Sequence, residues 1–408
     1  MKPASDALVV GAGPVGCFTA MSLAKLGVET TVFEEHPEIG VPTHCAGHLS
    51  IRSLKALGFY PLPAGIVENT FSAANFYSPD GTKFAVRLSK PVTCVVNREL
   101  FDKFLAKKAE AEGAKFSLST RVHSLAIKDN FVTGVKIDQK DVGESQFLAK
   151  IVVDAEGISS RLSRQAGLTP LNCERIVYAV ETEMQNVNNL EDEAVEVFVG
   201  NNYAPGFYAW VIPRRDGTAK VGLATRRGNP KEFLQRLVCK HPVAMKQLGK
   251  AYVKRSDFHC IPLGGPISKA YTNGFLAIGD AASQVKPTTG GGVVFGLKCA
   301  RIAAEVVHEA LEGDDFSAEF LSSYQKRFVD TLSFDINVML QARRFIDSLS
   351  DEKLNNALHF CNRVGLDKVF RDIDEIDFQG QTLLKMLTKP AAVGALAYFL
   401  VLHLTANL

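Results

Sequence analysis

The residues best suited to chemistry in this chain are glycines that follow an apolar run near the N-terminus. Gly11, Gly13 and Gly16 form a Gly-x-Gly-x-x-Gly pattern directly after residues 6–10, which predict a buried strand. In this pattern the first glycine makes a tight turn, the second lets the backbone approach a pyrophosphate, and the third lets a helix pack on the sheet. Phosphates then lie at the helix N-terminus, where free N–H groups and the helix dipole favour negative charge. The segment predicts a dinucleotide-binding βαβ unit.

Glu34 ends the second apolar run, eighteen residues after Gly16. An acid at this point accepts hydrogen bonds from the ribose of a bound dinucleotide. Its charge would disfavour an adenosine that carries a 2′-phosphate. The simpler alternative is a glycine-rich turn without a ligand, but here the strand, the helix and the terminal acid all fall in register.

Two later segments place a glycine or an acid at the end of a predicted strand. Residues 146–153 lead to Asp154, and residues 274–278 lead to Gly279 and Asp280. Open α/β sheets bind ligands at the carboxyl ends of their parallel strands, so we expect both segments to lie beside the first glycine turn. Asp280 would be placed for sugar hydroxyls. Its alternative role is that of a helix cap, which is common for Asp.

A further glycine turn, residues 290–292, precedes a long predicted helix whose positive end would face an electron-rich ring. A cofactor that needs a pyrophosphate site, a polyol site and a ring site at one sheet edge is FAD. A second Gly-x-Gly-x-x-Gly motif after a strand is missing, so any nicotinamide donor would bind transiently. No histidine or cysteine lies in an obvious linkage motif, so we expect the FAD to be noncovalent.

Length and composition indicate a globular protein with more than one subdomain, because 408 residues exceed what one core usually organises. With 46 basic and 44 acidic residues the net charge is +2, which gives no reason to expect nucleic acid as a partner. The eight cysteines are scattered, without a Cys-x-x-Cys pair or iron–sulfur spacing, which indicates reduced thiols and a cytoplasmic location. The N-terminus lacks the apolar core of a signal peptide.

The order of these motifs resembles that of glutathione-reductase-type flavoproteins of the aromatic-hydroxylase arrangement, and more closely that of the geranylgeranyl reductase family. Three segments carry the closer resemblance: Pro42-Thr-His-Cys45-Ala-Gly47, Tyr208-Ala-Trp210-Val-Ile-Pro213 and Pro287-Thr-Thr-Gly290-Gly-Gly292. The resemblance covers nearly the whole chain. The chain departs from it at Ile212, where the family's substrate motif usually has Phe, and at Glu156, where the hydroxylases carry Asp.

The resemblance implies an α/β fold with a glutathione-reductase-type FAD-binding Rossmann domain, an antiparallel β substrate domain and a C-terminal helical region. We expect a discontinuous FAD-binding domain over residues 1–70, 92–172 and 262–330. We expect the substrate domain over residues 71–91 and 173–261, and the helical region over residues 331–408.

The resemblance also implies roles for individual residues. Cys45 is the expected catalytic residue, because the resemblance places its loop beside the flavin ring. No metal ligands are expected. The expected substrate-binding residues are His44, Tyr208, Trp210, Pro213 and Pro287. The expected FAD-binding residues are Gly11, Gly13, Pro14, Gly16, Glu34, Glu35, Cys45, Ala46, Gly47, Arg98, Val122, Asp154, Gly157, Gly279, Asp280, Gly291 and Gly292.

Simpler explanations exist for two of these segments. Tyr208 and Trp210 share one face of a predicted strand, with Phe207 on the other, and this face either lines an apolar tunnel for an isoprenoid chain or belongs to an ordinary core. Cys45 is either reactive or a small buried hydrophobe. Its neighbours give the pattern His-Cys-x-x-His, which superficially suits a metal, although no further ligand cluster lies nearby in the sequence.

The function implied is that of an FAD-dependent prenyl reductase that saturates C=C bonds of geranylgeranyl chains, in precursors of archaeal membrane glycerophospholipids. Such an alkene is unpolarised, so it needs a proton donor as well as a hydride, and a thiol with its usual pKa of about 8.5 is protonated at neutral pH. The alternatives are an aromatic-hydroxylase-type monooxygenase and a non-catalytic flavin electron carrier. The expected partners are an isoprenoid lipid and a reduced electron donor, namely ferredoxin, NAD(P)H or reduced flavin.

The C-terminal residues 391–408 carry no formal charge except through His403. The segment is long enough to approach a bilayer span, but Gly394, Thr405 and Asn407 interrupt it. We therefore expect a buried or interfacial helix, and a cytoplasmic protein with peripheral membrane contact.

Overall fold

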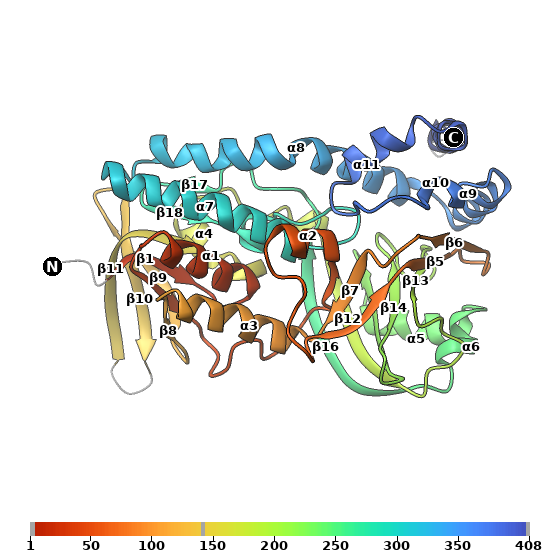
Figure 1. Ribbon diagram of the computed structural model, residues 1–408, viewed down its shortest axis with the longest axis horizontal. Helices are drawn as coiled ribbons and strands as arrows, with labels where there is room; N and C mark the ends of the chain where they lie inside the picture. Colours follow the sequence, from red (N-terminus) through yellow and green to blue (C-terminus); the bar gives the residue numbers. More distant parts are fainter. Residues whose placement is uncertain (1–4, 140–142, 405–408) are drawn as a thin grey trace. The chain divides into compact units, whose positions relative to one another are not determined.

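The structure is a computed structural model that describes residues 5–139 and 143–404 (Figure 1). The chain divides into two compact units, and each is made from three separate stretches of sequence. The first unit comprises Met1–Thr43, Arg98–Cys173 and Pro262–Phe334, and the second comprises His44–Asn97, Glu174–Ile261 and Asp335–Leu408.

The first unit is built on a sheet whose parallel strands follow the order β18-β11-β1-β2-β8. In register, Val10 lies beside Asp154, and Asp154 lies beside Ala277. The three predicted ligand segments therefore do follow neighbouring parallel strands at one sheet edge, which confirms this part of the sequence analysis. The strands are β1 (Ser5–Val10), β2 (Thr30–Phe33), β8 (Lys115–Ser117), β11 (Gly143–Asp154) and β18 (Phe275–Ala277), and the short β17 (Tyr271–Thr272) pairs antiparallel with β18.

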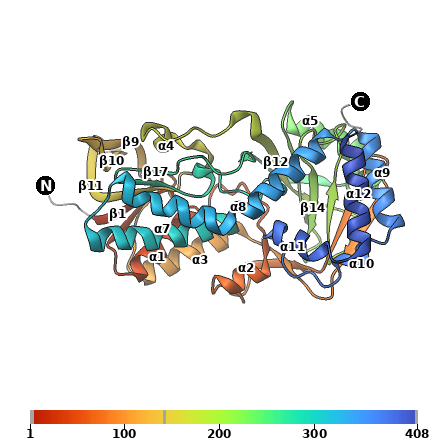
Figure 2. The same cartoon turned by 90° about the horizontal axis from the view of Figure 1, so that it is seen from above.

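Helices pack beside this sheet and bury its apolar side chains. Helix α1 (Pro14–Lys25) contacts both α3 (Arg98–Ala111) and α7 (Val293–Gly313). The first part of α8 (Ala318–Ser348) runs beside α7, where Arg327 binds Glu309 in two hydrogen bonds (Figures 1 and 2). The short elements are η1 (Gly157–Ser159), α4 (Arg161–Gln165) and η3 (Gly279–Ala282), and β9 (Arg121–Lys128) and β10 (Phe131–Gln139) extend β11 as antiparallel strands.

The second unit contains a seven-stranded sheet in the order β16-β12-β15-β14-β13-β5-β6. We predicted an antiparallel sheet, but β13 and β5 pair in parallel, because β5 enters the sheet from a much earlier stretch of the chain. Helices α5 (Pro230–Lys240) and α6 (Ala244–Leu248) cover one face, where Leu234 and Leu237 pack against Val221. The strands are β5 (Ala73–Tyr77), β6 (Lys83–Arg87), β12 (Ile176–Gln185), β13 (Ala194–Phe198), β14 (Ala209–Pro213), β15 (Ala219–Thr225) and β16 (Tyr252–Pro262), and η2 (Cys173–Arg175) precedes β12.

A small three-stranded sheet also belongs to the second unit. Its strands are β3 (His48–Ser50), β7 (Thr93–Val96) and β4 (Val67–Phe71), with α2 (Ile51–Ala56) after β3. We predicted that residues 44–70 and 92–97 belong to the FAD-binding domain. Their contacts group them with the second unit instead, because these strands pair with one another and add nothing to the nucleotide sheet.

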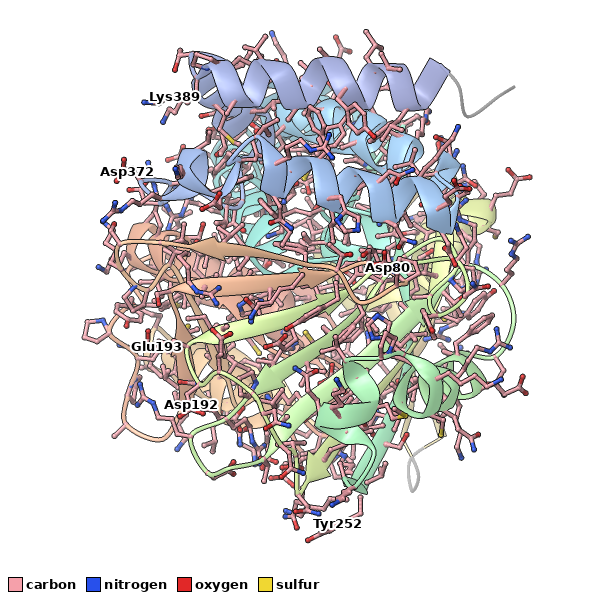
Figure 3. All side chains as sticks on the ribbon, turned by 90° about the vertical axis from the view of Figure 1, so that its right-hand side faces the viewer. Asp80, Asp192, Glu193, Tyr252, Asp372 and Lys389 are labelled. Carbon is pink, nitrogen blue, oxygen red and sulfur yellow. The ribbon has the colours of Figure 1, made fainter. Side chains whose placement is uncertain are left out.

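The C-terminal helices pack on the β6 edge of the second unit (Figure 3). Phe84 and Val86 of β6 share a hydrophobic cluster with Leu366, Ala392 and Ala395. The predicted C-terminal helical region therefore packs against the substrate sheet through a shared hydrophobic cluster. The helices are α9 (Asp351–Arg363), α10 (Asp367–Phe370), α11 (Gln379–Met386) and α12 (Pro390–Leu404).

Within the described residues, no single helix is long and apolar enough to cross a membrane. Helices α11 and α12 pass that test only as a pair, and they are bent by 113° at the break between them. Residues 405–408, which the predicted apolar segment includes, lie outside the described part of the chain.

Candidate active site

The first glycine turn contains three glycines. At two of them close packing leaves no room for a side chain, and the third faces open space. Gly11 has φ +98°, and a Cβ there would lie 2.5 Å from the Ala155 carbonyl oxygen. A Cβ on Gly16 would lie 1.9 Å from the carbonyl oxygen of Gly11. Gly13 is the N-cap of α1 without a side-chain cap, and a Cβ there would meet nothing within 4 Å. The N–H groups of the first turn, which begins at Pro14, are therefore accessible to an anion.

Glu34 lies beside this turn and is held by backbone donors. Its Oε2 accepts the Ala12 N–H at 2.8 Å, and its Oε1 accepts the His36 N–H at 2.9 Å. The side chain is 12% exposed, and a carboxylate has further lone pairs that ribose hydroxyls would use. The neighbouring Glu35 is exposed and lies 3.5 Å from Arg121.

Asp154, at the end of β11, organises the second segment. Its carboxylate accepts hydrogen bonds from Ser163 Oγ at 2.6 Å and from the Glu156 N–H at 3.0 Å. Burial, with the nearby charge of Glu156, raises the pKa of Asp154 to about 7. Glu156 itself accepts the Leu162 N–H at 2.7 Å and so fixes the turn at Gly157. Glutamate therefore serves this turn although the hydroxylases have Asp at the position.

Asp280 and the last glycine turn form the third segment. A Cβ on Gly292 would lie 2.6 Å from Asp280 Oδ1, so the carboxyl group lies close to the N-cap of α7. Desolvation raises the pKa of Asp280 to about 6, and the charge of Arg98 acts in the opposite direction. A Cβ on Gly291 would lie 2.6 Å from Lys286 Cε, so the Lys286 side chain lies over this turn and would have to move to admit one.

The remaining predicted residues of the first unit have structural partners as well. Arg98 binds the carboxylate of Asp102 through Nε at 3.1 Å and Nη2 at 2.9 Å, and both side chains are buried. The Val122 carbonyl accepts a hydrogen bond from Arg161 at 3.1 Å. Pro287 is buried in the turn before α7.

Cys45 belongs to the second unit, in the loop between β2 and β3. The cysteine is partly exposed, His44 is exposed, and Gly47 is buried. The Ala46 carbonyl accepts a hydrogen bond from Lys220 at 3.0 Å. This contact was not predicted from the sequence, because the alternation of β15 alone gave no reason to bury a lysine.

His48, the second histidine of the metal-like pattern, lies 2.7 Å from Thr93 Oγ1 through its Nε2. Among the residues that the structure describes, no group of three His, Cys, Asp or Glu side chains is placed to hold a metal ion.

Tyr208 and Trp210 make an aromatic contact on the second unit, with ring centroids 5.8 Å apart. The Trp210 ring covers Gly222 of β15, where a Cβ would lie 2.2 Å from the indole. We predicted that Phe207 faces away from Tyr208, and this was wrong: the two rings stack at 4.3 Å, since regular alternation begins only at Ala209. Burial raises the pKa of Tyr208 well above its usual value.

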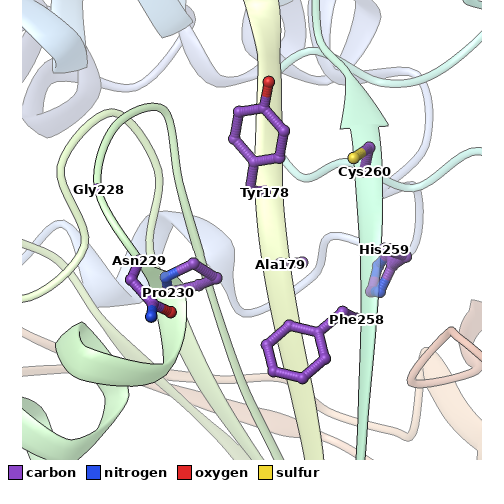
Figure 4. A pocket seen from close by; sticks show the side chains of 8 residues that line it. All are labelled: Tyr178, Ala179, Gly228, Asn229, Pro230, Phe258, His259 and Cys260. Atoms are coloured by element: carbon purple, nitrogen blue, oxygen red, sulfur yellow. The ribbon is translucent and has the colours of Figure 1, made fainter.

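A surface hollow of about 440 Å³ lies elsewhere on the second unit, between β12, β16 and the start of α5 (Figure 4). Its lining contains no residue that we predicted for cofactor or substrate. The lining residues are Tyr178, Ala179, Gly228, Asn229, Pro230, Phe258, His259 and Cys260.

The glycine geometry predicts different outcomes for two alanine substitutions. Gly13→Ala should leave the apoprotein folded, because its Cβ meets no protein atom, but should weaken FAD binding by filling the space above the α1 N-terminus. Gly16→Ala should instead destabilise the apoprotein by roughly 1–3 kcal/mol through the clash with Gly11. Thermal unfolding of the two apoproteins and FAD titration would check both. Equal destabilisation by the two substitutions would contradict the assignment.

Comparison with known proteins places this geometry in a family. A family model described as an FAD binding domain matches residues 4–329. Digeranylgeranylglycerophospholipid reductase 2 of Methanopyrus kandleri is 35% identical over 86% of this chain and 88% of its own length. The digeranylgeranylglycerophospholipid reductase of Methanococcus vannielii is 30% identical over 98% of each chain.

Solved structures agree with the fold. A geranylgeranyl bacteriochlorophyll reductase-like protein from Thermoplasma acidophilum superposes with a TM-score of 0.86, at 27% identity, over 97% of this chain and 99% of that one. The flavin-dependent brominase Bmp2 reaches a TM-score of 0.70 at 18% identity, over 89% of this chain and 92% of its own, and so shares the fold alone. The cofactor is FAD, and the chain belongs to the geranylgeranyl reductase family of FAD-dependent oxidoreductases.

Proposed function

We propose that the chain saturates C=C bonds in the geranylgeranyl chains of glycerophospholipids of the archaeal type. The observation that carries this proposal is its relation to curated digeranylgeranylglycerophospholipid reductases, at 35% identity over 86% of the chain. The matched length includes most of both units, so the relation is not confined to the nucleotide sheet.

We assign the binding of FAD to the three segments at the edge of the first sheet. The free N–H groups at the start of α1 bind the pyrophosphate, and Glu34 accepts the hydroxyls of the adenosine ribose. Asp280 accepts sugar hydroxyls, and the α7 N-terminus stabilises negative charge on the ring. Arg98, Asp154 and the other predicted residues of this unit hold these segments in place.

The proposed chemistry requires one group from the second unit. Bound and reduced, FAD supplies a hydride from N5. An isolated alkene also needs a proton at its other carbon, and we assign that proton to the Cys45 thiol. The cysteine suits this role because it is partly exposed in a loop, and the resemblance places that loop beside the ring. The alternative donors are His44, His48, Tyr208 or an ordered water.

The substrate chain is assigned to the aromatic face of the second sheet. Trp210 is nearly buried, at 9% exposure, and lies on the face opposite the Val221 core. Tyr208 and Trp210 present rings that an isoprenoid chain would contact without any polar requirement. Pro213 ends the strand that carries them.

The function is tested by anaerobic incubation of the dithionite-reduced protein with geranylgeranyl glycerophospholipids. We expect mass gains of about two units for each bond saturated. Dithionite makes the result independent of the physiological donor, which we propose to be ferredoxin, NAD(P)H or reduced flavin. A monooxygenase would instead consume oxygen with NAD(P)H, and an electron carrier would bind flavin and leave the lipid mass unchanged.

Gly222→Ala should impair lipid turnover and leave FAD binding unchanged. Its Cβ would displace the Trp210 ring, and a misplaced contact of this kind costs up to roughly 10²-fold in rate. Val221→Ala is the matched control, because it removes core methyl groups on the other face of the same strand. Turnover and FAD content should be measured well below the unfolding temperature. If Gly222→Ala kept the parental turnover, the assignment of Trp210 to the substrate site would be wrong.

Cys45→Ser should slow proton delivery by roughly 10²-fold or more, because a hydroxyl is a much weaker acid than a thiol. FAD content should be preserved, since the nucleotide segments lie in the first unit. The measurement is single-turnover reoxidation of reduced flavin by lipid, with Cys239→Ser as the control at an exposed cysteine of the same unit. Rates within about threefold of the parent would assign the proton to another group.

We also propose that α12 touches the membrane surface. Its exposed side chains include Val393, Leu396, Leu400 and Val401, each 46–57% exposed, while Ala392 and Ala395 pack inside the unit. Truncation would uncover that core, so substitution of the exposed face is the better test.

Leu396→Lys with Leu400→Lys should reduce binding to liposomes by several-fold and leave FAD content unchanged. Val253→Lys with Phe258→Lys on β16 is the matched control, since these apolar side chains are equally exposed in the same unit. A co-sedimentation assay gives the answer. Equal loss in both variants would place the membrane contact outside α12.

A further inference from the structure

Lys220 of β15 is a buried lysine whose ammonium group reaches the loop that carries Cys45. Its Nζ donates to the carbonyl oxygens of Ala46 at 3.0 Å and Val96 at 2.9 Å, and it lies 2.7 Å from Glu68 Oε2. An ammonium group has three N–H donors, and three acceptor oxygens surround this one. The side chain is 11% exposed. This environment therefore suits a lysine and no apolar residue of similar length.

The backbone of β7 holds the same loop at the next residue. The Val96 N–H donates to the Gly47 carbonyl at 2.9 Å, and Gly47 has φ +73°. The two carbonyl groups that follow Cys45 are thus both held, the first by Lys220 and the second by β7. Removing the lysine would release the contact nearest the cysteine.

A wider set of charges fixes the lysine side chain in turn. Glu68 lies 3.3 Å from Arg214 Nη1 on its other oxygen, and Arg214 also pairs with Glu183 and Asp216. Buried ion pairs contribute little to stability compared with apolar residues of similar size. A network of this kind is better explained by the geometry that it imposes on the loop.

We propose that Lys220 is a positioning residue for Cys45, which holds the loop so that the thiol keeps the orientation needed for proton transfer. Only the catalytic part of this inference rests on the proposed role of Cys45 as the proton donor. The contact between Lys220 and the loop can be tested without turnover.

The first experiment compares Lys220→Met with the parent holoenzyme. Release of the loop should raise the alkylation rate of Cys45 by iodoacetamide at least about fivefold, followed by peptide mass spectrometry. Cys239, exposed on α5 in the same unit, provides an internal control and should react at the parental rate. Single-turnover flavin reoxidation should fall by up to roughly 10²-fold, with the KM for lipid and the FAD content near parental values.

A second pair of variants separates positioning from folding. Lys220→Met with Glu68→Gln removes both charges of this pair, so the Glu68 carboxylate does not face an apolar side chain in place of the lysine. The double variant should reproduce the faster alkylation and the slower reoxidation. Lys254→Met, on the exposed β16, should change neither. A folded double variant with parental alkylation and reoxidation would overturn the proposal.

The unsubstituted protein provides a test that needs no variant to fold. Lys220 should resist reductive methylation under conditions that modify Lys254, because its ammonium is enclosed by the three oxygens. Equal modification of the two lysines in the folded protein would contradict the contact. If Cys45→Ser keeps full activity while these alkylation and methylation results hold, the proton-donor role fails and the Lys220 contact stands.

Discussion

The parallel pairing of β1, β11 and β18 is the constraint on which the rest of the cofactor unit depends. Val10, Asp154 and Ala277 lie side by side on neighbouring strands, so three segments far apart in sequence end at one sheet edge. Each segment then turns at a glycine with positive φ, namely Gly11, Gly157 and Gly279. The proposed FAD site thus follows from the strand order, and individual side chains add contacts to it.

Buried carboxyl groups at this edge show how the fold and the site share residues. Asp154 uses its oxygens on its own turn, whereas the Asp280 carboxyl lies against the glycine that begins α7. For both groups desolvation raises the pKa, to about 7 and about 6. Burial thus disfavours the charged forms, so the stability of the apoprotein falls as the pH rises from the ordinary aspartate pKa of about 4 to these values. Hydrogen-bond donors from a bound ligand would offset that cost.

The sequence predicted the parts of this structure that depend on local pattern. The Gly-x-Gly-x-x-Gly turn, its flanking strand and helix, and the edge position of Asp280 all follow from short-range chemistry. Non-local pairing was harder to predict: the parallel pair of β13 and β5 joins segments more than a hundred residues apart. Lys220 was missed because a lysine on an alternating strand normally indicates a solvent-facing position.

The proposed proton transfer from Cys45 requires its thiol to lie beside bound FAD. Protection of Cys45 from alkylation by FAD tests this claim directly, with apoprotein and FAD-loaded protein compared by peptide mass spectrometry. We expect FAD to slow the alkylation of Cys45 by about tenfold or more, while the exposed Cys173 and Cys239 react at unchanged rates. Equal rates for Cys45 with and without FAD would contradict the account.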